Sequence, residues 1–103
     1  MSVDHIRQKL WEAINSLVRD GSIQDRLYYA SNSLVQLAPD ELDQLPGEMR
    51  ARFDEVRHTL TKHPAEREGE GAIRASVRKL TPDEGTQIAQ EIVSIYVGLR
   101  GGI

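Results

Sequence analysis

The sequence contains no cysteine, and this absence excludes disulfide bonds, thiol catalysis and thiolate metal ligands. A cytoplasmic location is the expectation that agrees best with it. The N-terminus has no basic stretch followed by an apolar run, so we expect no secretory signal. No apolar segment approaches the roughly 20 residues that span a bilayer, so we expect no association with membranes.

Aromatic residues are scarce as well: they make up 5% of the 103 residues, so the core must be built from Leu, Ile and Val. A chain of this length is expected to form a single domain over residues 1–103. The net charge of −3 gives no overall attraction for nucleic acid or membranes. The charge is uneven, because residues 50–79 carry eight basic and five acidic side chains, a balance of +3, between two acidic ends.

No stretch alternates between polar and apolar residues for long enough to form a strand, whereas apolar residues recur at helical spacing. This pattern predicts an all-α fold, a compact bundle of four to five amphipathic helices that are mostly antiparallel and joined by short connections. The helices are expected over about residues 3–19, 23–38, 47–62, 71–80 and 82–99, with a short helical turn within 40–45. Residues 62–71 are expected to form a mobile loop, and residues 100–103 a frayed tail.

The last predicted helix has the clearest start signal. Thr81 is a good N-cap residue, and Glu84 three positions later completes a capping box. The apolar residues behind this start follow the helical period and require a groove formed by other helices; they are Ile88, Ile92, Ile95, Tyr96 and Leu99. Gly85 costs the helix up to about 1 kcal/mol relative to alanine, which indicates that another helix approaches closely there.

The chain has more apolar side chains than its narrow helical stripes require. The additional ones are Trp11, Tyr28, Tyr29 and Val35, together with Val93 and Tyr96. Aromatic surface that a small bundle leaves uncovered marks an interface. The leading hypothesis is therefore a small non-catalytic protein–protein interaction module whose partner is a second copy or another protein. The competing interpretation is a monomer that covers these groups with the loop at 62–71 and the turn at 40–45.

A candidate anion-binding site follows the predicted loop. Its members are Gly69, Gly71, Arg74, Arg78 and Lys79. Glycines let backbone N–H groups approach an anion, and Arg74 and Arg78 share one helical face. The basic 50–79 region as a whole gives an alternative function, the binding of nucleic acid or another polyanion. However, Glu70 would repel an anion, the pattern is neither a P-loop nor a dinucleotide fingerprint, and a flexible loop followed by a solvated basic helix explains the same residues.

Arg52 and His58 provide the one catalytic hypothesis. Their spacing resembles that of the catalytic arginine–histidine pair in a helical family of ribonucleases that usually act as dimers. The resemblance, which covers seven residues, implies that His58 acts as a general base and that Arg52 stabilises phosphorane-like charge. The sequence departs from the family because Phe53 follows the arginine in place of a polar Asn or Asp. Moreover, a separation of six residues puts the two side chains about 120° apart around a helix.

No metal site and no cofactor are expected. The nearest approach to a ligand set consists of His58, His63, Glu66, Glu68 and Glu70. Two histidines five residues apart do not share a helical face, and glutamates that alternate along a mobile loop make a poor cage. No serine lies in a recognisable nucleophile motif. The sequence therefore favours a binding protein over an enzyme.

Overall fold

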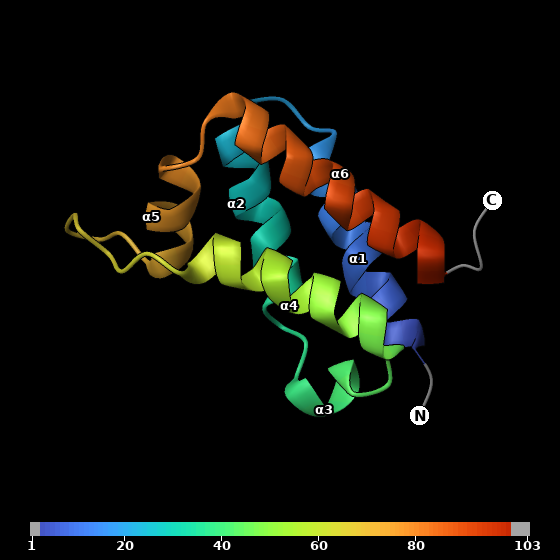
Figure 1. Cartoon of the computed structure of the whole chain (residues 1–103). Coiled ribbons are helices and arrows are strands. Elements are labelled where there is room, and N and C mark those ends of the chain that lie inside the picture. The colour runs from blue at the N-terminus through green and yellow to red at the C-terminus, as the bar shows by residue number, and fades with distance from the viewer. Residues whose placement is uncertain (1–2, 100–103) are drawn as a thin grey trace.

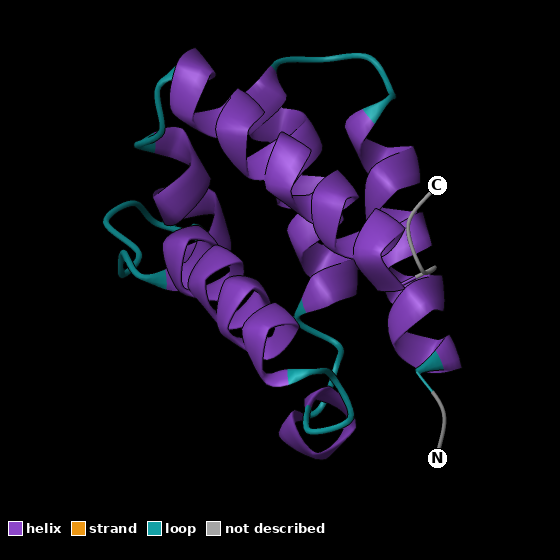
Figure 2. Ribbon diagram, turned by 45° about the vertical axis from the view of Figure 1, so that its right-hand side comes forward, coloured by secondary structure: helices purple, strands orange, loops and turns teal. Residues whose placement is uncertain are grey.

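The computed structural model describes residues 3–99, and every regular element in that range is a helix (Figures 1 and 2). The helices are α1 (Asp4–Leu17), α2 (Ile23–Leu34), α3 (Pro39–Leu42), α4 (Gly47–Thr61), α5 (Ala72–Arg78) and α6 (Pro82–Leu99). The all-α compact bundle is thus confirmed, with α3 as a single turn beside five longer helices. The predicted tail at 100–103 lies outside the described residues. Within 3–99 no helix is both long and apolar enough to cross a membrane.

Two of the helices begin at residue types that favour the N-cap, Ser22 and Thr81. The hydroxyl of Ser22 accepts a hydrogen bond from the backbone N–H of Asp25 at 3.1 Å, which caps α2. At α6, Thr81 Oγ1 accepts from the N–H of Glu84 at 3.1 Å, and Glu84 Oε1 accepts from the N–H of Thr81 at 2.9 Å. The predicted capping box is confirmed.

The end of α2 was predicted less accurately, because the helix stops at Leu34 and not near residue 38. Beyond Leu34 the chain tightens into i to i+3 hydrogen bonds, from Gln36 N–H to the Ser33 carbonyl and from Leu37 N–H to the Leu34 carbonyl. Ala38 is then extended, with ψ at 152°. Proline disfavours the helical conformation in the residue before it, so Pro39 favours the extended conformation of Ala38.

The central helix of the bundle is α2, which contacts α1, α4, α5 and α6. The core that surrounds it is aliphatic, as the composition predicts, with one buried phenylalanine. Its largest members are Ile6, Leu10, Leu27, Leu34, Leu37, Leu42, Phe53, Leu60, Ile92 and Ile95. The close approach inferred from Gly85 is also confirmed, because a Cβ at this buried position would lie 3.1 Å from two side-chain carbons of Ile23 in α2.

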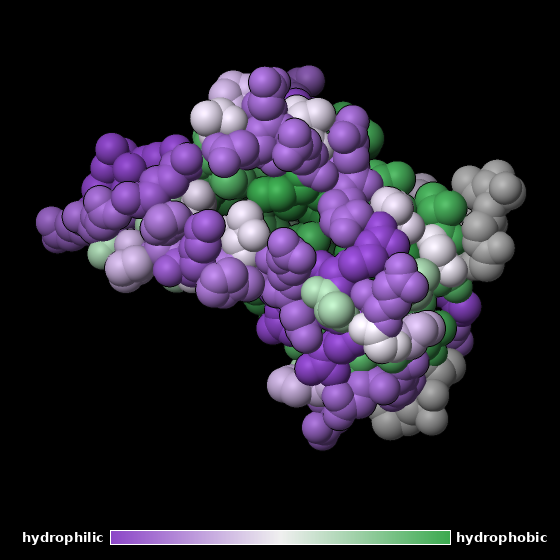
Figure 3. Space-filling model, viewed as in Figure 1, coloured by the Kyte–Doolittle hydropathy of each residue, from purple (hydrophilic) through white to green (hydrophobic). Residues whose placement is uncertain are grey.

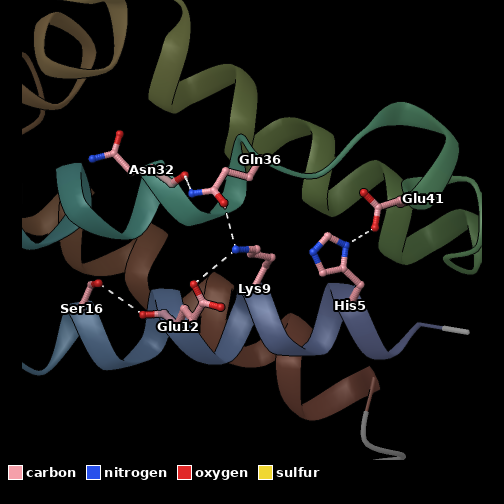
Figure 4. Close-up of polar contacts among 7 residues, drawn as sticks. All are labelled: His5, Lys9, Glu12, Ser16, Asn32, Gln36 and Glu41. Carbon is pink, nitrogen blue, oxygen red and sulfur yellow. Dashed lines mark hydrogen bonds and ion pairs between the residues drawn. The ribbon is translucent and has the colours of Figure 1, made fainter.

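One flank of α1 carries polar side chains that form hydrogen bonds to α3, to the residues after α2 and within α1 itself (Figure 4). Lys9 Nζ lies between Gln36 Oε1 at 2.9 Å and Glu12 Oε1 at 3.4 Å. Nearer the N-terminus, the His5 ring bonds to the carboxylate of Glu41 in α3, and this hydrogen bond lowers the pKa of Glu41. Because α2 and α3 occupy this flank, the other flank of α1 is the one that meets α6.

Candidate protein interface

The helices α1 and α6 lie side by side and run antiparallel. Near the start of α1, Arg7 Nη2 donates to the carbonyl of Leu99, the last residue of α6, at 3.0 Å. One turn further along α1, the ring of Trp11 lies 5.8 Å from the ring of Tyr96 in a tilted arrangement. Contacts of this kind are worth about 0.5–1.5 kcal/mol beyond their burial, so the contact favours this orientation of the indole against α6.

The outer side of this helix pair exposes apolar side chains. Trp11 is 51% exposed, Val18 is 76% exposed and Val93 is 40% exposed. Ala89, Val93 and Tyr96 follow one another at spacings of four and three along α6, which places them on one side of the helix. We refer to the surface formed by Trp11, Val18, Ala89, Val93 and Tyr96 as the α1/α6 face.

The α6 part of this surface has no solvated charge. After the first turn of the helix, the exposed residues are Thr86, Gln87, Gln90, Val93, Ser94 and Gly98. The one charged residue between Gly85 and Leu99 is Glu91, which is paired with Arg52 of α4. By contrast, α4 exposes Glu48, Asp54 and Glu55. Depletion of charge is a property of interface cores more than of ordinary helix surfaces.

In the space-filling view α4 and α6 lie in front of α1 (Figure 3). Hydrophobic residues gather between α6 and α4, below the upper polar rim, and again towards the right-hand side, where α6 approaches its C-terminus in Figure 1. Polar residues dominate the rest of that view, including the end at which the loop between α4 and α5 projects.

A hollow of about 380 Å³ lies at one end of the α1/α6 face. Its apolar lining comes from three helices and includes Leu17, Ile23, Ala89 and Val93, while Thr86, Gln90 and Arg26 supply polar groups. Arg26 is held in place because its Nη1 donates to the Leu17 carbonyl at 2.9 Å. The hollow is therefore apolar with a polar boundary, as binding pockets generally are.

The predicted interface residues do not come together in one place. Of the residues predicted as excess apolar surface, three lie on the α1/α6 face, namely Trp11, Val93 and Tyr96, and three belong to α2 and its C-cap, namely Tyr28, Tyr29 and Val35. Tyr28 and Tyr29 form an edge-to-face pair on α2, with ring centres 5.3 Å apart. The guanidinium of Arg74 lies 3.7 Å from the centre of the Tyr28 ring, and that of Arg19 lies 4.3 Å from the centre of the Tyr29 ring. These two tyrosines already have cationic partners within the chain.

Helical spacing assigns Val18 to the edge of the apolar stripe of the helix predicted over residues 3–19, yet its side chain is 76% exposed. The helix ends at Leu17, so Val18 is its C-cap. Its spacing of seven from Trp11 puts both residues on the same side of an α-helix, and both are exposed.

The three cations of the predicted anion site each have a carboxylate partner in the chain. Arg74 pairs with Asp25 at 2.9 Å, and Lys79 pairs with Glu66 at 2.5 Å. Arg78 donates through Nε and Nη2 to the two oxygens of Glu70, at 2.9 and 3.2 Å.

Glu70 is the anion that this region binds. Besides Arg78, its carboxylate accepts the backbone N–H of Glu66 at 3.0 Å. These hydrogen bonds, Arg78 foremost, lower the pKa of Glu70 to about 2. Gly69, with φ at 76°, and Gly71, the N-cap of α5, flank it. An external anion would have to displace Glu70, and its binding at this site stays a prediction.

The segment 62–71, expected to be a mobile loop, connects α4 to α5 without regular structure. Three contacts join it to α5 and the C-cap of that helix: the Glu70–Arg78 pair, the Glu66–Lys79 pair, and a hydrogen bond of 2.9 Å from the backbone N–H of His63 to the hydroxyl of Ser76. Ser76 is buried. The mobility of the segment stays a prediction.

Most of the basic 50–79 region is likewise neutralised. Arg50 pairs with Asp43 at 2.6 Å and with Asp54 at 3.0 Å, which raises the pKa of the arginine. Together with the four pairs of Arg52, Arg74, Arg78 and Lys79, five of the eight basic residues in this region have carboxylate partners. Several of those carboxylates come from outside the region, so its +3 balance is largely offset in the folded chain.

Arg52 and His58 are not brought into one site. Arg52 donates to both oxygens of Glu91, at 3.0 and 2.6 Å, and to the Ser94 hydroxyl at 2.8 Å. This pairing raises the pKa of Arg52 and lowers that of Glu91. A cleft of about 310 Å³ lies beside the pair, between α4 and α6, with Val56 and Ile88 in its lining. His58 is exposed elsewhere on α4.

Among residues 3–99, no three His, Asp or Glu side chains are placed so that they could share a metal ion. Comparisons of the chain with protein-family models, with curated proteins and with solved structures give no match. A functional assignment therefore depends on the residues themselves. Of the four exposed large hydrophobic residues within 3–99, three lie on the α1/α6 face: Trp11, Val18 and Val93.

Proposed function

We propose that the protein is a small non-catalytic protein–protein interaction module that binds its partner through the α1/α6 face. The observation that supports this proposal is a half-exposed tryptophan beside a helix surface with no solvated charge. Aromatic enrichment and charge depletion together distinguish the cores of interfaces from the rest of a protein surface. We also propose a cytoplasmic location, because the chain has no cysteine.

Trp11 has the properties of a binding hot spot. Tryptophan is enriched among the residues whose truncation costs about 2 kcal/mol or more of binding free energy. Its contact with Tyr96 orients the indole before any partner arrives. A side chain that is ordered in advance loses less entropy on binding, which favours affinity.

The other hypotheses have weaker support from the same structure. A polyanion-binding protein needs basic groups that are available to phosphates, and most cations of the 50–79 region already pair with carboxylates. A ribonuclease of the kind suggested by Arg52 and His58 needs both groups at one phosphate, whereas Arg52 is engaged by Glu91.

Site-specific photocrosslinking in the cells that naturally produce the protein tests the proposal. A benzophenone side chain replaces Val18 on the α1/α6 face, outside the hollow, or, as a matched control, the exposed Ala51 on α4. We expect irradiation to give protein adducts from position 18 and none from position 51. Adducts with a second copy or with another protein both support the proposal. If position 18 gives no protein adduct, or the two positions give the same adducts, the proposal is wrong.

A further inference from the structure

The α1/α6 face has both a projecting group and a hollow. Trp11 projects near one end, where it lies against Tyr96, and the hollow opens around Leu17, Ala89 and Val93. Six residues separate Trp11 from Leu17, which corresponds to about 9 Å along α1 at a rise of 1.5 Å per residue. Projection and hollow therefore lie next to each other, offset along the same pair of helices.

We propose that the partner is a second copy of this chain, packed about a two-fold axis so that Trp11 of each copy enters the hollow of the other. This inference rests on the proposed function, in which the α1/α6 face binds a protein. A two-fold interface uses the same surface on both copies, so every contact between two different residues occurs twice. An axis that passes midway between Trp11 and Leu17 brings each projection over the opposite hollow.

The lining of the hollow suits an indole ring. Its volume of about 380 Å³ is at the lower end of the roughly 300–1,000 Å³ typical of ligand pockets and admits one aromatic side chain. Leu17, Ile23 and Ala89 provide apolar contact. At the boundary, the amide oxygen of Gln90 is a suitable acceptor for the indole N–H. The guanidinium of Arg26 offers a cation to the ring face.

The charge distribution favours a second copy in particular. Near a two-fold axis each side chain meets its own equivalent, so an unpaired charge there would repel itself. The exposed α6 residues from Thr86 onward are all uncharged, and Glu91 is paired with Arg52 on the opposite flank of α6. Arg26 lies at the hollow, away from the axis, where it meets an aromatic ring and not another arginine.

The available area agrees with a dimer of modest strength. A standard interface covers about 800 Å² of each partner, which is about one seventh of the 5928 Å² that this chain exposes. With 18 residues, α6 is about 27 Å long, and two adjacent helices about 10 Å wide give a projected face of roughly 540 Å². Because accessible area exceeds projected area, the face reaches the lower range of specific interfaces, and we expect a micromolar dissociation constant.

Sedimentation equilibrium of the purified full chain between 1 and 300 µM tests the inference. We expect the mass to rise from 11.6 kDa toward twice that value. Trp11 is the only tryptophan, so its fluorescence emission should move to shorter wavelength over the same concentrations. Trp11→Ala should raise the dissociation constant at least tenfold, and so should Ala89→Arg, which fills the hollow. Tyr29→Ala, an exposed aromatic residue on α2, is the matched control and should leave the constant unchanged.

Mixing the two variants tests the reciprocal geometry. The Trp11→Ala chain keeps its hollow and the Ala89→Arg chain keeps its indole. A mixed dimer therefore keeps one contact between an indole and a hollow, whereas each homodimer of a variant has none. We expect more dimer in the mixture than in either variant alone. Circular dichroism melts confirm that each variant folds, and Val93→Arg, at an exposed position, replaces Ala89→Arg if that chain does not.

Two results would overturn the inference: a chain that is monomeric throughout the range, or a dimer that is indifferent to both substitutions and to their mixture. A monomeric chain that still gives adducts from position 18 with a different protein leaves the proposed function in place. If position 18 gives no adduct, the proposed function itself fails.

Discussion

Replacing Gly85 with alanine should destabilise the protein, although alanine is the better helix former. Gly85 is buried in the first turn of α6, where this helix crosses α2. A methyl group there would lie 3.1 Å from both Cγ1 and Cγ2 of Ile23 and 3.3 Å from Cδ1 of Leu27. Both γ-carbons of Ile23 belong to one stiff β-branched side chain, so a χ1 rotation cannot clear both contacts and the helices must separate slightly.

The magnitude follows from two opposing effects. Helix propensity favours alanine over glycine by about 1 kcal/mol, while overpacking a close contact costs about 1–3 kcal/mol. We expect a net loss of about 1 kcal/mol for Gly85→Ala and about 3 kcal/mol for Gly85→Val. Gly98→Ala is the matched control in the same helix. Its methyl group would meet only the flexible end of Met49, which can move aside, so the stability should increase by up to about 1 kcal/mol.

Thermal unfolding followed by far-UV circular dichroism measures these changes. For a domain of this size, 1 kcal/mol shifts the melting temperature by about 4–8 °C. The expected order of melting temperatures is Gly98→Ala, wild type, Gly85→Ala and Gly85→Val, from highest to lowest. If Gly85→Ala raises the melting temperature as much as Gly98→Ala does, the proximity of α2 is not the reason for glycine at this position.

Three further predictions concern the core, the loop and the basic region. Ile92 is 1% exposed, so Ile92→Asp should abolish the helical circular dichroism signal, because an unpaired buried carboxylate costs several kcal/mol of a total free energy of unfolding of about 5–15 kcal/mol. The control Gln90→Asp, on the exposed side of α6, should fold. A folded Ile92→Asp chain would mean that α6 is misplaced. The pKa of Glu70 falls from 4.5 to about 2 on folding, so its contribution to stability is complete above pH 4.5 and is lost as the pH falls toward 2. The melting temperatures of wild type and Glu70→Gln should therefore differ most at neutral pH and converge in acid, and a pH-independent difference would contradict the role of this pair. Single- and double-stranded oligonucleotides at low salt should show no binding in a fluorescence-anisotropy titration, whereas binding that weakens as salt rises would mean that the paired cations are accessible to phosphates.

The features that depend on neighbouring residues were predictable from the sequence. The N-caps at Ser22 and Thr81 act on backbone groups three residues away, so their patterns are complete within a few letters. The excess cost of glycine in a helix is also a local property, and it correctly indicated the approach of α2 at Gly85.

The pairing of charges could not be inferred in the same way. Arg52 and Glu91 are 39 residues apart, and Arg74 and Asp25 are 49 residues apart. Whether a cation is available to a ligand depends on which carboxylate the fold brings to it. Periodicity gives the face of a helix on which a residue lies, but not the neighbouring helix that the face meets.

The residues that lie together on the candidate interface could not be predicted for the same reason, because periodicity does not give the neighbouring helix. Trp11 was identified as excess apolar surface, yet its structural neighbour is Tyr96 of the last helix and not the tyrosines of the second. That neighbour depends on α6 lying beside α1, and the order of helices in space is a property of the whole bundle. The exposure of Val18 depends on where α1 ends, and helix ends are set by competing weak effects.

The bond between the backbone of His63 and the buried hydroxyl of Ser76 also determines how the molecule opens. Helix α5 has only seven residues, too few to persist alone, so it stays helical only while it is packed on α2 and α4. The N–H of His63 is shielded for as long as α5 is in place, although it belongs to a largely exposed connection. Its exchange with deuterium therefore reports the detachment of α5 together with the segment that precedes it. We expect this opening to leave the α1–α2 hairpin intact, because the contacts between those two helices do not involve α5, and the bundle would then contain a cooperative unit smaller than the whole domain.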